Sequence, residues 1–175
     1  MRNDSDRWPT PRPTQGIDFT SENLTIRRDP PVQQTLISGP LDAAINFANV
    51  GLPNRWPDVA QGDRYLVSMR RDRVLAVNAS INRFGWIDPE GLAISDATAA
   101  YTIISVIGSN ALEVLRTGTE LSLKTQSNSA VRLWNGYDVL LYRFGNEQDF
   151  RLHVPSALQD SVVEMLERQA RLLTF

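Results

Sequence analysis

Residues 94–118 constrain the fold more than any other part of the chain. An apolar run over residues 101–107 stops at a glycine, and a short leucine-containing segment follows it. Both faces of the run are largely apolar when its residues are read with period two, which is typical of a strand in the middle of a sheet. The stretch therefore predicts a central strand, a tight turn with Ser109 as N-cap, a brief helix over residues 109–117 and Gly118 as C-cap.

Composition excludes several kinds of site. The chain has 175 residues, no cysteine and a single histidine, His153. Without cysteine it has no disulfide, no thiolate nucleophile and no structural zinc site of the usual kind, and one histidine cannot build a multi-histidine metal site. The net charge is −2 and the basic residues form no long run, so the electrostatic footprint of a nucleic-acid-binding protein is lacking.

The hydropathy pattern gives no sign of a membrane protein. No run of 18 apolar residues is present, and the first residues have no apolar segment like that of a signal peptide. We expect no membrane partner, no nucleic-acid partner and a cytoplasmic location. An apolar fraction of 42% in this length suits one domain or two small fused subdomains.

The first part of the chain differs in composition from the rest. Residues 1–31 are polar, are punctuated by prolines and contain an isolated Trp8. A segment of this kind cannot bury enough apolar surface to order itself. It predicts an extended or disordered N-terminal tail, either free or laid on a partner or on the chain's own sheet edge.

Residues 32–90 and 91–175 share an order of elements: strand, turn with Ser and Gly, short helix, loop and hairpin. In the first unit the predicted strands are 32–37, 64–69 and 73–79, with a helix at 41–50 and a loop at 53–62. In the second they are 101–107, 131–134, 137–144 and 150–154, with an Asn135-Gly136 hairpin turn and a long final helix that starts at a Ser156/Gln159 capping box. The pattern predicts an α+β fold of two small related units, each with a mainly antiparallel sheet and helices on one face.

Four groups of residues invite a functional interpretation. They are His153, the Gly108-Ser109-Asn110 turn, the acidic Asp88, Glu90 and Asp96, and the aromatic Tyr101, Trp134, Tyr137 and Tyr142. Each has a simpler structural explanation: a histidine at a strand end, a helix cap without the further glycines and lysine of a phosphate loop, a Pro-Gly turn, and core aromatics. We therefore predict no catalytic, cofactor-binding or metal-binding residue in this chain.

Four segments share a pattern with a known family. They are ISDAT at 94–98, ISVIGSNA at 104–111, VLLYR at 139–143 and DFRLHVPSA at 149–157. In this order they resemble the γ subunit of heterotetrameric sarcosine oxidase and, more distantly, the folate-binding domain of the glycine-cleavage T-protein (aminomethyltransferase) superfamily. A looser match extends the resemblance to roughly residues 50–173. The family's Gly-Pro turn has Ser109 in place of its proline, so the partner enzyme could act on an N-methyl compound other than sarcosine.

The resemblance implies a T-protein-like fold and a function. The chain would be a non-catalytic γ subunit of a flavin-dependent sarcosine oxidase heterotetramer, or of a related N-methyl amine oxidase or demethylase linked to folate one-carbon metabolism. Its partners would be larger flavoprotein subunits, α-like and β-like, which carry FAD, FMN, NAD and tetrahydrofolate. Two alternatives stay open: an autonomous folate-dependent aminomethyltransferase-like protein, against which the short chain counts, and a small-molecule-binding module.

Overall fold

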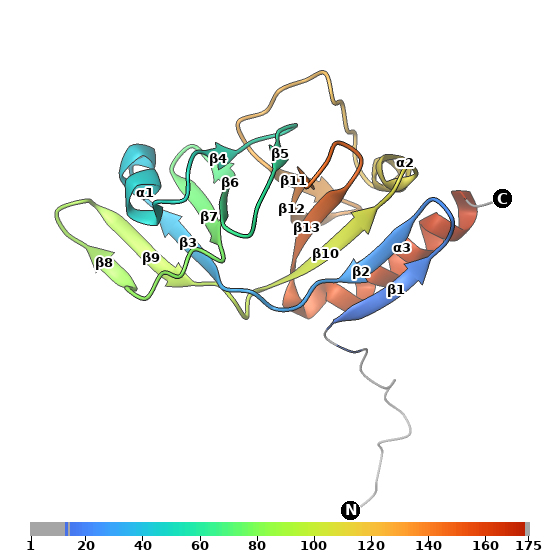
Figure 1. Ribbon diagram of the computed structural model, residues 1–175, viewed down its shortest axis with the longest axis horizontal. Coiled ribbons are helices and arrows are strands. Elements are labelled where there is room, and N and C mark those ends of the chain that lie inside the picture. The colour runs from blue at the N-terminus through green and yellow to red at the C-terminus, as the bar shows by residue number, and fades with distance from the viewer. Residues whose placement is uncertain (1–12, 14, 174–175) are drawn as a thin grey trace, which may run out of the picture.

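The computed structural model describes residue 13 and residues 15–173, which form two β-sheets with helices on their outer sides (Figure 1). The six-stranded sheet has the order β4 (Pro53–Asn54), β6 (Tyr65–Arg70), β7 (Arg73–Val77), β3 (Gln34–Ser38), β9 (Leu92–Asp96) and β8 (Gly85–Ile87). Its pairs are antiparallel except β4 with β6. Helix α1 (Leu41–Ala48) packs on one face of this sheet.

The seven-stranded sheet is built from both ends of the described chain. Its order is β1 (Gly16–Thr20), β2 (Thr25–Arg28), β10 (Tyr101–Ile107), β13 (Phe150–Pro155), β12 (Tyr137–Phe144) and β11 (Val131–Trp134), and β5 (Val59–Ala60) pairs in parallel with β12. Helices α2 (Ala111–Arg116) and α3 (Gln159–Leu173) cover its outer face, and a 3-10 turn, η2 (Ser156–Leu158), leads into α3. None of the described helices is long and apolar enough to cross a membrane.

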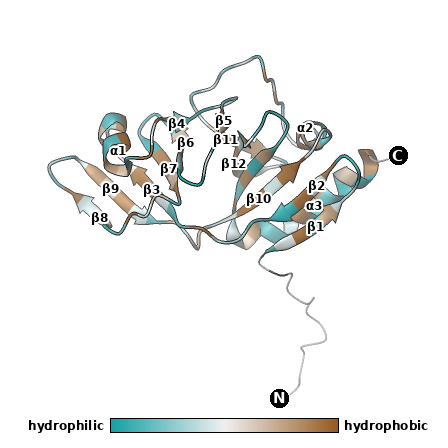
Figure 2. Cartoon of the chain, in the orientation of Figure 1, coloured by the Kyte–Doolittle hydropathy of each residue, from teal (hydrophilic) through white to brown (hydrophobic). Residues whose placement is uncertain are grey.

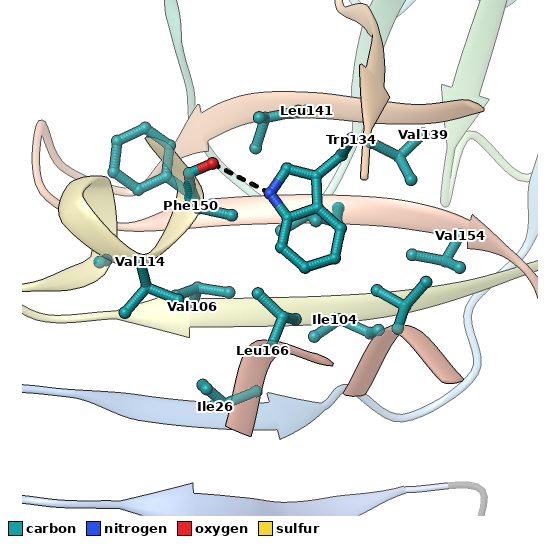
Figure 3. Close-up of a cluster of buried hydrophobic side chains, with 14 of the residues drawn as sticks. Ile26, Ile104, Val106, Val114, Trp134, Val139, Leu141, Phe150, Val154 and Leu166 are labelled. Carbon is teal, nitrogen blue, oxygen red and sulfur yellow. Dashed lines mark hydrogen bonds between the residues drawn. The ribbon is translucent and has the colours of Figure 1, made fainter. Parts of the chain in front are cut away.

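The apolar residues lie mainly on the strands (Figure 2) and divide into three clusters by strand alternation. One cluster lies between the seven-stranded sheet and α2 and α3, and it contains Trp134, whose indole N–H donates to the carbonyl of Leu115 over 2.9 Å (Figure 3). A second lies between the six-stranded sheet and α1. The third lies where the inner faces of the two sheets meet, with Val67 and Leu75 on one side and Leu140 and Tyr142 on the other.

Several predicted elements are confirmed. Strands β10, β11 and β12 occupy the predicted residues, and β3, β6, β7, β13 and α1 differ from the prediction by a few residues at their ends. Asn135 and Gly136 both have positive φ, 47° and 86°, as a tight hairpin turn requires. The α+β class with antiparallel-rich sheets is also confirmed.

The predicted caps are wrong. Asn110, not Ser109, occupies the N-cap of α2, and it makes no side-chain capping bond. Gly118 does not adopt the left-handed conformation; a Cβ there would collide with the indole of Trp134, so close approach is the reason for glycine. The Ser156/Gln159 capping box does not form, because Gln159 instead accepts a hydrogen bond from the Thr102 hydroxyl on β10 over 3.0 Å.

The second half of the predicted tail lies on the chain's own sheet edge, one of the arrangements expected, but as a folded hairpin rather than as an extended or disordered segment. Residues 16–28 form the β1–β2 hairpin, which adds to the edge of β10. Leu24 and Ile26 are buried in the outer cluster, and Arg28 is paired with Asp18 and Asp160. The hairpin is ordered because Leu24 and Ile26, two residues apart, both reach the core. The average polarity of residues 1–31 does not reveal this local pattern. Trp8 lies outside the described residues.

The boundaries between sheets also differ from the predicted boundary at 90/91. β9 at residues 92–96 belongs to the six-stranded sheet, and β5 at 59–60 belongs to the seven-stranded sheet. The loop expected at 53–62 carries the short strands β4 and β5, and the β8–β9 hairpin is an addition to the predicted elements. Whether the two sheets are separate units stays a prediction.

Candidate functional site: a polar network between the sheets

A chain of polar side chains, all buried except the partly exposed Arg151, crosses from one sheet to the other. Arg151 Nη1 donates to the Tyr65 hydroxyl over 2.8 Å, and the hydroxyls of Tyr65 and Tyr142 lie 2.9 Å apart. The Tyr142 hydroxyl lies 2.6 Å from His153 Nε2, and His153 Nδ1 lies 2.6 Å from Gln34 Oε1. Tyr65 and Gln34 come from the six-stranded sheet, and the other three come from the seven-stranded sheet. The network therefore joins the two sheets through side chains.

The bonds at the ends of the network set the direction of every bond within it. Gln34 Nε2 donates to the carbonyl of Tyr101 over 2.9 Å, so Gln34 Oε1 is free to accept from His153 Nδ1–H. His153 Nε2 then accepts from Tyr142, which in turn accepts from Tyr65. All donors point the same way, from Arg151 towards Gln34, and His153 is the neutral Nδ1–H tautomer.

The ionisation of these groups agrees with this direction. Burial, and then the positive charge of Arg151, lower the pKa of His153 from 6.5 to about 3. Burial raises the pKa of Tyr65, and burial together with Tyr65 raises the pKa of Tyr142 well above its usual value. Both phenols keep their protons and His153 stays uncharged, so at neutral pH the network carries charge only at its Arg151 end.

Asp29 neutralises that end. Its Oδ1 accepts from Arg27 Nε over 3.0 Å, and its Oδ2 accepts from the Ser105 hydroxyl over 2.8 Å. Arg151 Nε lies 3.2 Å from the same Oδ2, an ion pair whose geometry is not that of an aligned hydrogen bond. The guanidinium of Arg151 also lies over the ring of Phe144, with its Cζ 3.4 Å from the ring centroid. Asp29 and Arg151 are thus held by charge, hydrogen bonds and stacking together.

A cavity of about 530 Å³ lies beside the Gln34 end of the network, between the link from β2 to β3 and the link from β9 to β10. Pro30, Pro31 and Ile103 supply apolar wall, and Gln34 and Asp29 supply polar groups. No lysine or arginine is among its lining residues. The cavity has the size of a small-ligand pocket, but Gln34 and Asp29 are already bonded within the network.

The turn at residues 108–110 is structural. Gly108 N–H donates to the carboxylate of Asp149 over 3.0 Å, and Asn110 N–H donates to the carbonyl of Asn23 over 3.2 Å. A Cβ at Gly108, whose φ is +113°, would press on that same carbonyl in the β1–β2 turn. Two N–H groups that a phosphate would need are bonded to oxygen atoms of the chain itself, one of them a carboxylate.

The other sequence candidates are not brought together as a site. Asp88 lies in the turn between β8 and β9, whereas Asp96 is the last residue of β9, where it pairs with Thr35 on β3. The Asp96 carboxylate accepts from Thr98 N–H over 2.9 Å. Trp134 and Tyr137 pack in the outer cluster of the seven-stranded sheet, whereas Tyr101 and Tyr142 pack in the inner one. Across residue 13 and residues 15–173, no three acidic or histidine side chains gather closely enough to hold a metal ion.

Sequence reasoning missed most of the network. It singled out His153 and Tyr142 separately and overlooked Gln34, Asp29, Tyr65 and Arg151. A usable signal was present in β13, where Arg151 and His153 alternate with three apolar residues and so share one face. That alternation shows that Arg151 and His153 share a face, and the structure supplies the polar partners opposite it.

Taken together, these features define the chain as an α+β protein with a polar layer between two sheets. No protein-family model matches the sequence, and a comparison with curated proteins gives no match. Among solved structures, the chain is similar to a chain of the heterotetrameric sarcosine oxidase from Corynebacterium sp. U-96, a complex that holds pyrrole 2-carboxylate. The TM-score is 0.66 at 18% identity, over 89% of this chain and 88% of that one.

A second similar structure is the glycine-cleavage-system aminomethyltransferase T from Bartonella henselae. It has a TM-score of 0.50 at 14% identity, over 79% of this chain and 44% of that protein. At these identities the likeness concerns the fold. The resemblance to sarcosine oxidase and to the T-protein that the sequence indicates is confirmed at that level.

Proposed function

We propose that this chain is a non-catalytic small (γ) subunit of a heteromeric, flavin-dependent oxidoreductase complex related to sarcosine oxidase. The observation that carries the proposal is the extent of the structural likeness, which takes in 89% of this chain and 88% of the sarcosine oxidase chain. Because the aligned region is nearly the same fraction of each chain, the two chains are of similar length. Fold and size both match a component of a hetero-oligomer.

The second comparison favours a subunit over an autonomous transferase. The chain spans less than half of the aminomethyltransferase, 44% of its length. A protein of this size would have to carry the whole transferase site on part of that enzyme's framework. We therefore rank the hypothesis of an autonomous aminomethyltransferase-like protein second.

The candidate site supports a structural role for the polar network. His153 is 0% exposed and its pKa is lowered to about 3, so it is neither accessible nor a base near neutral pH. The Asp29 carboxylate accepts bonds from Arg27 and Ser105 rather than facing a reactant. These groups hold the two sheets in one relative position, which gives a partner a fixed surface.

On this proposal the cofactors FAD, FMN, NAD and tetrahydrofolate belong to the larger α-like and β-like subunits. The cavity beside Gln34 does not fit a dinucleotide, because its lining includes no lysine or arginine to meet the phosphates. The substrate of the complex would be sarcosine or another N-methyl amine, oxidised with demethylation on a flavoprotein subunit.

The test is to purify the chain from its native cells through a small affinity tag and to identify what accompanies it. We expect larger subunits in fixed stoichiometry, flavin absorbance in the complex and turnover of an N-methyl amine. Recovery of the chain alone would overturn the proposal. Stoichiometric binding of tetrahydrofolate to the isolated chain by calorimetry, with no larger subunit, would favour the aminomethyltransferase-like function instead.

A further inference from the structure

Two short links join the two sheets at one end of the molecule. Residues 29–33 lead from β2 to β3, residues 97–100 lead from β9 to β10, and both links lie at the bottom of Figure 1. All strands of the six-stranded sheet lie between the links in the chain, within residues 34–96. The cavity beside Gln34 separates the links, so this end of the interface between the sheets is loosely packed. The links alone would let one sheet turn relative to the other.

At the opposite end, residues 55–60 cross from the six-stranded sheet to the other sheet, and we call them the crossing segment. β4 pairs with β6, but β5 pairs with β12, and the chain then returns to the six-stranded sheet in β6. Arg143 Nε donates to the carbonyl of Pro57 over 2.7 Å, and Gly145 N–H donates to that of Ala60 over 2.9 Å. The crossing segment is therefore bound along its length to the edge of the seven-stranded sheet.

Trp56 anchors the crossing segment. It is 3% exposed, belongs to the outer cluster of the seven-stranded sheet and stacks on Phe150, with ring centroids 6.4 Å apart. Its indole N–H donates to the carbonyl of Ser122 over 2.9 Å, and its own carbonyl accepts from Ser127 N–H over 2.9 Å. A side chain that extends from one sheet is thus part of the core of the other.

The loop that bonds to Trp56, residues 122–130, makes a contact in the reverse direction. Ala130 N–H donates to the carbonyl of Ser68 on β6 over 2.8 Å, and the Ser68 hydroxyl donates to the carbonyl of Asn128 over 2.6 Å. The loop therefore lies against both the crossing segment and the six-stranded sheet. Because Trp56 bonds to two residues of this loop, its removal would loosen both connections at this end of the molecule.

Independently of the proposed function, we propose that residues 55–60 and 122–130 form a clasp, anchored by Trp56, that keeps the two sheets closed. When the clasp is released, the six-stranded sheet turns about the two links. The polar network then opens from its Arg151 end, because Arg151 lies farther along β13 from the links than His153 does. The network alone holds the sheets less firmly, since a neutral hydrogen bond contributes less than a buried indole.

Native-state amide hydrogen exchange in the full chain distinguishes release of the clasp from unfolding. The Ala130 N–H bonds across the clasp and reports its opening, whereas the N–H groups of Leu75 and Leu152 report unfolding of the centres of the two sheets. Trp56→Ala should speed exchange at Ala130 by about 30-fold or more, and at Leu75 and Leu152 by much less. Trp56→Phe keeps an aromatic ring but not the indole N–H, so it should give a smaller acceleration with the same selectivity. It also serves as the test if Trp56→Ala does not fold.

Trp134→Ala is the matched control. It removes the same side chain from the same cluster, but Trp134 belongs to β11 and donates to the carbonyl of Leu115 rather than to the loop of the clasp. It should speed exchange at Leu152 with no selective effect at Ala130.

Two results would overturn the clasp. Unchanged exchange at Ala130 in both Trp56 variants would mean that the sheets stay closed without the anchor. Equal acceleration at Ala130, Leu75 and Leu152 would mean that Trp56 contributes only to the stability of the whole fold, as any core residue does. Acceleration at Ala130 that exceeds that at both sheet centres would support the proposal.

Discussion

The two faces of the seven-stranded sheet differ in how they are buried. The outer face packs Trp134, Phe150 and Val154 against helices, and the indole N–H of Trp134 bonds to backbone. The inner face presents Tyr142, His153 and Arg151 to the other sheet, each bonded to a side chain that comes from the six-stranded sheet or the segment before it. The apolar face gains stability from burial in many arrangements, whereas the polar face is stable only in the one arrangement that satisfies every group. The outer face therefore contributes mainly to the stability of the fold, and the inner face mainly to its specificity for one arrangement of the two sheets.

The largest expected loss of stability comes from a substitution on the apolar outer face of the seven-stranded sheet. Trp134→Ala removes a fully buried indole and leaves a cavity, so we expect a loss of about 3–5 kcal/mol in the free energy of unfolding. Urea denaturation followed by circular dichroism measures it. Trp86→Ala, which removes the same side chain where it is 63% exposed, should change stability by less than about 0.5 kcal/mol. Equal losses in the two variants would contradict this account of the outer cluster.

The next effect tests the charged end of the polar side. Asp29→Asn keeps the size of the side chain but leaves the largely buried Arg151 without its counter-charge, and we expect a loss of about 3 kcal/mol. Asp72→Asn makes the same change in the exposed ion pair with Arg70, where the loss should be about 0–1 kcal/mol. Similar values for both would mean that the inner layer behaves like solvent-exposed surface.

The third prediction concerns how His153 makes the free energy of unfolding depend on pH. The pKa of His153 is about 3 in the folded chain and 6.5 in the unfolded chain, so below pH 6.5 the unfolded chain binds the extra proton. Its contribution to stability is complete above about pH 6.5 and is lost towards pH 3, at about 1.4 kcal/mol per pH unit. From pH 7 to pH 5 the wild type should therefore lose about 2 kcal/mol more than His153→Gln. Parallel pH profiles would show that His153 is accessible to protons in the folded state.

The smallest effect comes from a single hydroxyl. Tyr142→Phe removes the donor to His153 and the acceptor for Tyr65, and we expect a loss of about 1–2 kcal/mol. Tyr137→Phe, on the partly exposed side of the outer cluster, is the control and should be nearly neutral. Adding Tyr65→Phe to Tyr142→Phe should cost less than the sum of the two single changes, because the two hydroxyls share one bond. Strict additivity would indicate that the two hydroxyls act independently.

The sequence predicts the elements whose cause is local. The apolar run of residues 101–107 and the Asn135-Gly136 turn with its return strand at 137–144 are properties of neighbouring residues, and they match the structure. The caps failed because tertiary contacts decide them: Gln159 bonds to Thr102 rather than to its own helix. The local sequence pattern does not specify which residue from another element a side chain will contact.

The candidate site could not be predicted for the same reason. Gln34 and His153 are 119 residues apart in the chain, and their contact depends on how two whole sheets are oriented. Alternation in β13 indicates that Arg151 and His153 share a face, but it does not say whether that face meets water or another sheet. Only the three-dimensional arrangement places Tyr65 opposite them.

The β1–β2 hairpin has a consequence for synthesis on the ribosome. Residues 25–28 pair with residues 104–107, so the hairpin emerges well before the strand that completes its sheet. At about 5–20 residues per second that interval lasts roughly 4–16 s, during which Leu24 and Ile26 have no core to enter. The six-stranded sheet lies within residues 34–96 and can form in that time. The nascent chain thus exposes an unpaired apolar hairpin until residues 104–107 are made, a state that a chaperone would recognise.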